Sequence, residues 1–174
     1  IVVTAGGFEQ ALKDAPASVS VIRAEELQRG AFTNLADALR EVQGVSVTGI
    51  ANERDIFIRG LPSAYTLILV DGRRQSTRDA RPNGSAGYEQ SFIPPLSAIE
   101  RIEVVRGPMS ALYGSDAMGG VINIITRRPD QQWRGSVSAE ATAQQHDDSG
   151  NSGQLSFHLG GPLVRDRLGL QVWG

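Results

Sequence analysis

The stretch IERIEVVRGPMSALYGSDAMGGVINIITRRP, residues 99–129, decides the fold more than any other part of the chain. Its apolar runs predict a strand over residues 99–106 and a second strand over residues 121–126. Between them the sequence predicts a turn at Gly107-Pro108, a short helical turn over residues 109–113 and a glycine-rich crossing. This order of elements is common to many α+β domains, so the order alone does not fix the family.

Upstream of this stretch the sequence predicts a small mixed sheet with short helices, hence an α+β fold. Asn34 is a candidate N-cap, because Asp37 follows three residues later and an apolar stripe begins at Leu35 and repeats with helical spacing up to Gly44. The other predicted elements are strands over residues 17–22, 45–48, 56–59 and 66–70, the last closed by Asp71-Gly72, and a helix over residues 24–29.

Residues 76–91, STRDARPNGSAGYEQS, show no periodicity and replace aliphatic residues with Gly, Ser, Asn and Pro. The segment is predicted to be a long loop. A loop of this length in a compact domain is usually functional or disordered.

After Pro129 the pattern changes to alternation of apolar and polar residues, in three runs over residues 136–144, 154–159 and 168–172. The residues between the runs, 145–153 and 160–167, are predicted to be a loop and a turn. Two interpretations fit this period of two equally well. One is a half-buried antiparallel meander in a soluble protein, and the other is the opening strands of a transmembrane β-barrel.

Composition narrows the classes of function. The 174 residues suffice for one domain and a shorter appendix, and the formal net charge of −2, without runs of like charge, argues against a nucleic-acid partner. The chain has no cysteine, which excludes disulfides and thiolate metal sites. No segment approaches the roughly 18 apolar residues of a membrane-spanning helix, and the start of the chain does not resemble a signal peptide.

Four residue strings carry a resemblance to a known family: KDAPASVSVI at 13–22, IRGL at 58–61, YTLILVDGRR at 65–74 and IERIEVVRGPMSALYGSDAMGGVINIIT at 99–126. They resemble the TonB-dependent outer-membrane receptors, most closely the catecholate-siderophore receptors of the kind that includes the colicin I receptor. One departure is Gln43, where the family usually has proline. The resemblance implies a TonB box over residues 1–5, a plug domain over residues 6–129 and the start of the β-barrel, about three strands, over residues 130–174.

The first five residues have two interpretations. Alone, they could be an ordinary edge strand. By resemblance they are the TonB box, which offers an extended strand to the TonB C-terminal domain by β-augmentation. The residues concerned are Ile1, Val2, Val3, Thr4 and Ala5.

The resemblance also implies two arginines that hold the plug against glutamates of the barrel, and the matching positions are Arg59 and Arg106. Each is predicted to end a strand immediately before a glycine. The glutamates would lie beyond Gly174. Within this chain we therefore expect both arginines to be solvated or to pair with Glu100 or Glu103.

Ligand contacts are expected in the apical loops. Ferric catecholate complexes are anionic and carry flat aromatic rings, so arginine and tyrosine suit them by charge, hydrogen bonding and stacking. The candidates are Arg78, Arg81 and Tyr88, and Arg54 is a further candidate.

The implied function is a gate that admits a ferric siderophore through the outer membrane of a Gram-negative bacterium. Haem, cobalamin or another chelate is an alternative cargo. A soluble binding module that shares the plug topology is an alternative class of protein. A colicin-type toxin is a further partner that the resemblance allows. We expect no enzyme activity, no cofactor and no protein metal site, because the iron belongs to the siderophore. The segment GSDAMGG lacks the Gly-Lys-Ser/Thr of a phosphate-binding loop.

Overall fold

The computed structural model describes residues 2–3, 10–11, 18–30, 32–50, 53–75, 88–89, 93–128, 131–142, 152–165 and 167–174. The chain divides into two compact units, Ile1–Thr126 and Arg127–Gly174, called here the first and second units. No helix among the described residues is long and apolar enough to cross a membrane.

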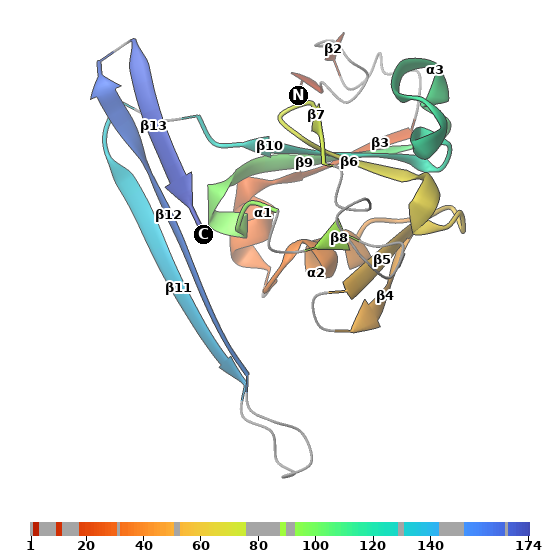
Figure 1. Ribbon diagram of the computed structural model, residues 1–174, viewed down its shortest axis with the longest axis horizontal. Coiled ribbons are helices and arrows are strands. Elements are labelled where there is room, and N and C mark those ends of the chain that lie inside the picture. Colours follow the sequence, from red (N-terminus) through yellow and green to blue (C-terminus); the bar gives the residue numbers. More distant parts are fainter. Residues whose placement is uncertain are drawn as a thin grey trace. The chain divides into compact units, whose positions relative to one another are not determined.

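A five-stranded sheet forms the centre of the first unit (Figure 1). Its strands lie in the order β3 (Ser18–Arg23), β9 (Ile99–Arg106), β10 (Gly120–Thr126), β6 (Thr66–Val70) and β7 (Arg73–Arg74). Strand β10 runs parallel to β6 and antiparallel to β9, so the sheet is mixed. Strands β6 and β10 consist mostly of apolar residues, many of them β-branched, which suits strands covered on both faces.

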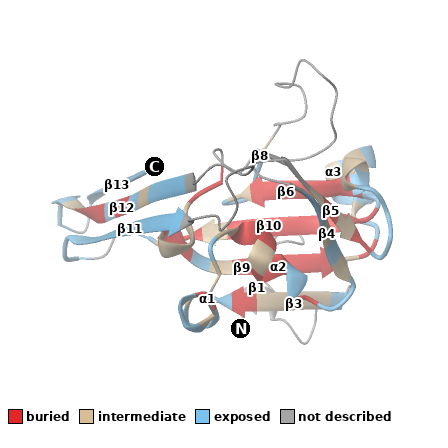
Figure 2. Cartoon of the chain, turned by 90° about the horizontal axis from the view of Figure 1, so that it is seen from below, coloured by how far each residue is buried: buried red, intermediate tan, exposed pale blue. Residues whose placement is uncertain are grey.

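Both faces of this sheet are covered, because alternate residues of a strand point to opposite faces. In β10, Ile122 and Ile124 belong to the larger core, whereas Val121 belongs to a smaller core on the other face. Figure 2 shows the central strands as the most buried part of the unit.

The larger core is covered by helices α1 (Ala24–Arg29) and α2 (Leu35–Arg40) and by strands β4 (Val45–Ile50) and β5 (Glu53–Ile58), which form a second sheet with β8 (Tyr88–Glu89). The smaller core lies under α3 (Ser110–Tyr113) and the 3₁₀ helix η6 (Ser115–Ala117). The other short elements are β1 (Val2–Val3), β2 (Gln10–Ala11) and the 3₁₀ helices η2 (Ser63–Tyr65) and η5 (Leu96–Ala98).

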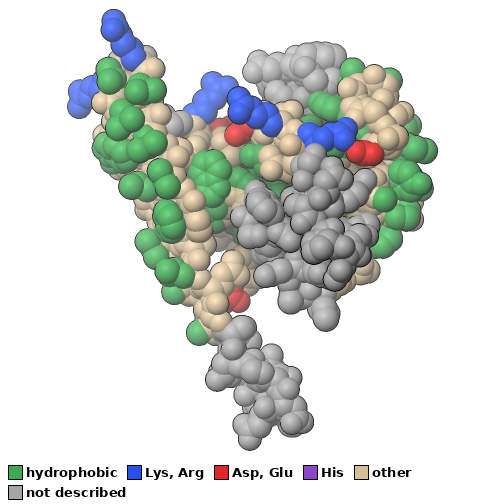
Figure 3. Space-filling view, in the orientation of Figure 1, with side chains coloured by type: hydrophobic (Ala, Val, Ile, Leu, Met, Phe, Trp, Pro, Cys, Tyr) green, Lys and Arg blue, Asp and Glu red, His purple; other side chains and the backbone are tan. Residues whose placement is uncertain are grey.

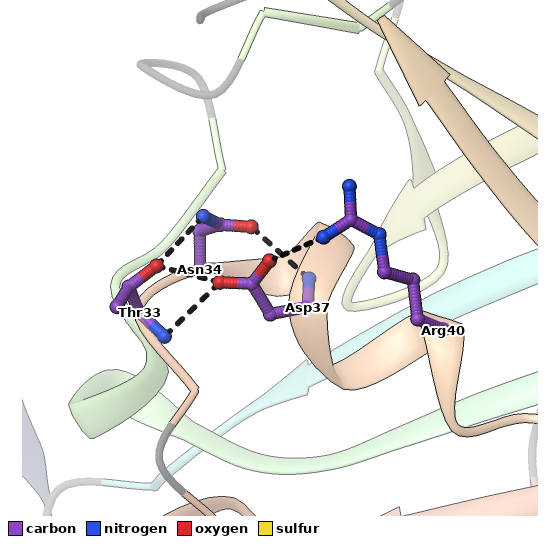
Figure 4. Close-up of polar contacts among 4 residues, drawn as sticks. All are labelled: Thr33, Asn34, Asp37 and Arg40. Carbon is purple, nitrogen blue, oxygen red and sulfur yellow. Dashed lines mark hydrogen bonds and ion pairs between the residues drawn. The ribbon is translucent and has the colours of Figure 1, made fainter. Parts of the chain in front are cut away.

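Helix α2 begins where the sequence predicts. The Asn34 side chain accepts a hydrogen bond from the backbone N–H of Asp37, at 3.1 Å. The Asp37 carboxylate in turn accepts from the Thr33 hydroxyl and pairs with Arg40, at 2.6 and 3.2 Å (Figure 4). The first of these contacts satisfies a backbone donor that the first helical turn leaves without an intrahelical partner, and the other two hold the Asp37 side chain in place.

The Asp71-Gly72 turn joins β6 to β7 with positive φ at both residues, 49° and 76°, as a hairpin turn of this kind requires. The Asp71 carboxylate accepts from the backbone N–H and the hydroxyl of Thr126, at 2.9 and 2.8 Å. Asp71 therefore fastens the end of β10, the last residue of the first unit, to the hairpin.

The second unit is an antiparallel sheet of β11 (Arg134–Thr142), β12 (Ser152–Val164) and β13 (Leu168–Trp173). Directly paired residues share a face, and one face of β12 carries exposed Leu155, Phe157 and Leu159, whereas the other carries Ser156 and His158. The predicted alternation of the three strands is confirmed.

The α+β class and the mixed sheet are confirmed, and three local predictions are wrong. Strand β12 continues to Val164, because Pro162 still lies in register with Gly169, so the predicted turn over residues 160–167 is shorter. Residues 88–89 of the predicted loop form strand β8, which pairs with β5, whereas residues 76–87 and 90–91 of that loop lie outside the described residues. Strand β5 ends at Ile58, so Arg59 follows the strand instead of ending it.

Candidate functional site

Arg106 lies at the end of β9 and is held by two hydrogen bonds. Its Nη1 donates to the backbone carbonyl of Gln43 at 2.5 Å, and its Nη2 donates to the hydroxyl of Ser20 at 2.8 Å. Its Nε is buried and has no hydrogen-bond partner within the described part of the chain. Among the described residues this guanidinium is therefore incompletely satisfied, and a buried donor left unpaired costs roughly 1–3 kcal/mol.

Arg59 lies beside the same turn. Its backbone N–H donates to the carbonyl of Gly44 at 2.8 Å, and its backbone has a positive φ of 52°. Its side chain is exposed, and its Nη1 lies 3.9 Å from where a Cβ on Gly107 would stand. The two arginines predicted from the sequence therefore meet at the turn Gln43-Gly44, and this group of residues is called the arginine site.

Pairing of either arginine with Glu100 or Glu103 is not what the structure shows. Both carboxylates bind Arg101 instead, at 2.7 and 2.9 Å. Residues 101 and 103 point to the face of β9 opposite the one that carries Arg106, because neighbouring positions in a strand alternate. Glu103 is fully buried on that face. The pKa of the Tyr113 phenol is raised, first because the phenol itself is partly buried and second because of the negative charge of Glu103.

Gln43, the departure from the family's usual proline, contributes its carbonyl and not its side chain to the arginine site. Any residue supplies that carbonyl, so the substitution leaves the contact with Arg106 intact. Sequence reasoning missed both Gln43 and Ser20 as partners of Arg106, since neither has a local signal that points to an arginine 63 or 86 positions away.

Gly119 and Gly120 make the close backbone crossing that the sequence predicts. A Cβ on Gly120 would lie 2.3 Å from the carbonyl oxygen of Val105, and its φ is 157°. A Cβ on Gly119 would lie 3.1 Å from the carbonyl oxygen of Tyr65. Only glycine fits position 120, because no side chain can approach backbone so closely.

The structure brings together two of the four candidate ligand residues. Arg54 in β5 and Tyr88 in β8 are directly paired across antiparallel strands, which places their Cα atoms opposite each other. Arg78 and Arg81 lie outside the described residues. Within the described residues no three His, Asp or Glu side chains are grouped so that they could hold a metal ion.

The N-terminal segment is described only in part. Val2 and Val3 form β1 and pair antiparallel with β2, so this pair of residues has extended backbone. Ile1, Thr4 and Ala5 lie outside the described residues. An extended segment is the conformation that β-augmentation requires.

A mixed sheet covered on both faces, two arginines gathered at one turn, and a following sheet of alternating strands define a receptor plug joined to the first strands of a barrel wall. The chain belongs to the TonB-dependent Receptor Plug Domain family, which matches residues 11–121.

Three proteins show which members of this family the chain is similar to. It is 54% identical to the iron-regulated outer membrane virulence protein of Vibrio cholerae serotype O1, over all of this chain and 27% of that protein. It is 39% identical to the ferrienterobactin receptor of Escherichia coli K12, over all of this chain and 24% of that receptor. The crystal structure of the siderophore receptor PirA from Acinetobacter baumannii matches with a TM-score of 0.75 and 35% identity, over 94% of this chain and 24% of PirA. The chain thus spans about a quarter of the length of these relatives.

Proposed function

We propose that the chain is the plug and the opening barrel strands of an outer-membrane receptor that imports a ferric siderophore of the catecholate type into a Gram-negative bacterium. The observation that carries the proposal is the plug fold over residues 11–121, with Arg59 and Arg106 gathered at one turn. The relatives named for enterobactin or siderophores support the choice of cargo.

In this proposal the first unit is a gate. The ligand contacts Arg54, Arg78, Arg81 and Tyr88 from outside, and TonB engages residues 1–5 from the periplasm. Energy comes through TonB, and the iron arrives bound to the siderophore, so the chain needs neither a cofactor nor a metal site of its own. A colicin-type toxin is a further partner of the outer surface.

The arginine site supplies the contact with the barrel. Arg106 Nε is a buried donor without a described partner, and the Arg59 guanidinium is exposed. Carboxylates of the barrel would satisfy these donors by charge-assisted hydrogen bonds. Such pairs fix geometry, and removal of one partner from a buried pair costs about 3–5 kcal/mol.

The test is uptake of iron-labelled ferric enterobactin by cells in which the full-length receptor is the sole catecholate receptor. We expect uptake that requires TonB and that excess haem or cobalamin does not inhibit. Uptake of haem or cobalamin with no uptake of ferric enterobactin would overturn the choice of cargo.

The ligand residues have a separate test. Replacement of Arg54 by Gln or of Tyr88 by Leu is expected to weaken binding of ferric enterobactin about tenfold, as the loss of one charge-assisted or stacking contact gives. The matched control is Arg40→Gln, which removes an exposed arginine of α2. Equal binding by all three variants would exclude Arg54 and Tyr88 from the site.

A further inference from the structure

The sheet of the second unit has one apolar face and one polar face. Val137 of β11 pairs directly with Phe157 of β12, and Leu159 of β12 pairs directly with Val172 of β13, so these four side chains share a face. Between 41 and 73% of the surface of each is exposed. This face is called the apolar face, and in the proposed function it meets the lipid chains of the outer membrane.

The apolar face has a length that matches the thickness of a membrane. Along β12 its large side chains extend from Leu155 to Val164, which pairs with Leu168. This length of strand spans about 30 Å. A tilt of about 40° leaves a height of about 23 Å, close to the roughly 25 Å of the apolar band on an outer-membrane barrel. The membrane boundary therefore falls near Val164, where β12 ends.

A tryptophan lies at the same end of the apolar face. A Cβ on Gly161 would lie 2.5 Å from Cδ2 of Trp133, so the indole ring packs directly on the glycine backbone. Gly161 pairs with Leu170, and that Cβ would therefore point to the apolar face. Trp133 is still 49% exposed. Tryptophan is enriched where a barrel wall passes from the lipid chains to the headgroups, so its position agrees with a boundary near Val164.

Two arginines lie directly beyond this boundary. The backbone N–H of Arg167 donates to the carbonyl of Val164 at 3.1 Å, which closes a tight turn between β12 and β13. Arg165 and Arg167 are both exposed in this turn. Both residues therefore lie where the headgroups of the lipids begin.

Charge is unevenly distributed between the two ends of this sheet. The segments at the end with the turn, residues 127–134 and 163–168, contain five arginines and two aspartates, a formal charge of +3. Residues 143–151, which join β11 to β12 at the other end, contain two aspartates and neither lysine nor arginine. Figure 3 shows basic side chains at the end of the sheet where β12 and β13 meet. This end suits an anionic partner, although the chain as a whole has a net charge of −2.

We infer that the turn over residues 165–167, together with Trp133, binds the headgroup of an anionic phospholipid in the periplasmic leaflet, and this inference rests on the proposed function. The turn faces the periplasm because barrels have short turns on that side and longer loops outside. A guanidinium donates two charge-assisted hydrogen bonds to one phosphate, and basic residues near the surface attract anionic lipid. The indole ring of Trp133 then covers the glycerol and the upper part of the acyl chains. The bound lipid fixes the height of the barrel wall in the membrane at this point.

The first test measures lipid binding to the purified full-length receptor by native mass spectrometry, with phosphatidylglycerol and phosphatidylethanolamine as probes. We expect tighter binding of phosphatidylglycerol. Arg165→Gln or Arg167→Gln should weaken that binding about fivefold, as the loss of one basic residue near a membrane surface gives. Binding of phosphatidylethanolamine should not change. No preference between the two lipids, or unchanged binding of phosphatidylglycerol by both variants, would overturn the inference.

The matched control is Arg134→Gln. Arg134 lies at the same end of the sheet but on the polar face, because it pairs with Gly160. This variant is expected to bind phosphatidylglycerol as the unaltered receptor does, and an equal loss would contradict a site at the turn. Excess inorganic phosphate should not displace the lipid. Displacement would contradict the inference, because the turn would then bind free phosphate.

Iron uptake by the same variants separates the inference from the proposed function. A receptor that imports ferric enterobactin but shows no preference for phosphatidylglycerol would contradict the inference and leave the proposed function intact. A receptor that prefers phosphatidylglycerol but imports only haem or cobalamin would overturn the choice of cargo and support the lipid site.

Discussion

The two units of the chain differ in whether their apolar side chains are buried or exposed. The first unit buries them on both faces of its sheet, so that Ile102, Ile122 and Ile124 are wholly inaccessible to water. The second unit leaves one face apolar and exposed, with Val137 at 73% and Leu155 at 68%. The first unit therefore supplies its own core, whereas the second needs an apolar phase from outside, as lipid provides to a barrel strand.

The largest expected effect tests the core of the first unit. Ile122→Ala should lower the free energy of unfolding of the chain by about 2–5 kcal/mol, because it leaves a cavity between sheet and helices. Leu155→Ala in the second unit should change it by less than about 0.5 kcal/mol. Hydrogen exchange of peptides from the first unit measures this loss. Tryptophan fluorescence does not report on the first unit, because both tryptophans lie in the second unit. Equal losses would end the distinction between the units.

The next prediction concerns the two faces of β12 in the full-length receptor folded into lipid vesicles. Phe157→Arg should cost about 2–4 kcal/mol if its side chain meets lipid near the bilayer centre. Ser156→Arg, on the opposite face of the strand, should cost much less. Denaturant titration of both variants measures this, and a greater loss for Ser156→Arg would reverse the assignment of the faces.

A smaller effect is expected where the first unit ends. Asp71→Asn keeps a residue that tolerates positive φ but loses one acceptor for Thr126, so we expect a loss of about 1–2 kcal/mol. Amide exchange at Thr126 should accelerate accordingly. Glu41→Gln removes a charge from an exposed side chain and serves as control. No change at Thr126 would show that the Asp71 carboxylate does not fasten β10.

The smallest predicted effect is the loss of the cap on α2. Asn34→Ala should cost about 1 kcal/mol, because the Asp37 N–H loses its acceptor. Asn34→Ser keeps an acceptor and should retain most of the stability. The free energy of unfolding of the first unit is measured for both variants. A loss of stability as large for Asn34→Ser as for Asn34→Ala would mean that the hydrogen bond of the cap is not what stabilises the helix.

Local signals predict much of the first unit. The apolar run at residues 99–106 gives the bounds of β9, and Asn34 with Asp37 gives the start of α2. The partners of Arg106 could not be predicted, because they depend on the register of β3 against β9, which sets Ser20 diagonally across from Arg106. Strand β8 escaped prediction for the same reason, since two residues in a polar loop become a strand only by pairing with β5.

The proposed function requires that TonB opens the first unit, the gate, through residues 1–5. The most direct measurement is binding of the TonB C-terminal domain to the ligand-loaded full-length receptor, with and without these residues. We predict that the intact receptor binds and that the shortened receptor, which still binds ligand, does not. Equal binding by both receptors, or binding by neither, would contradict a role of residues 1–5 in the contact with TonB.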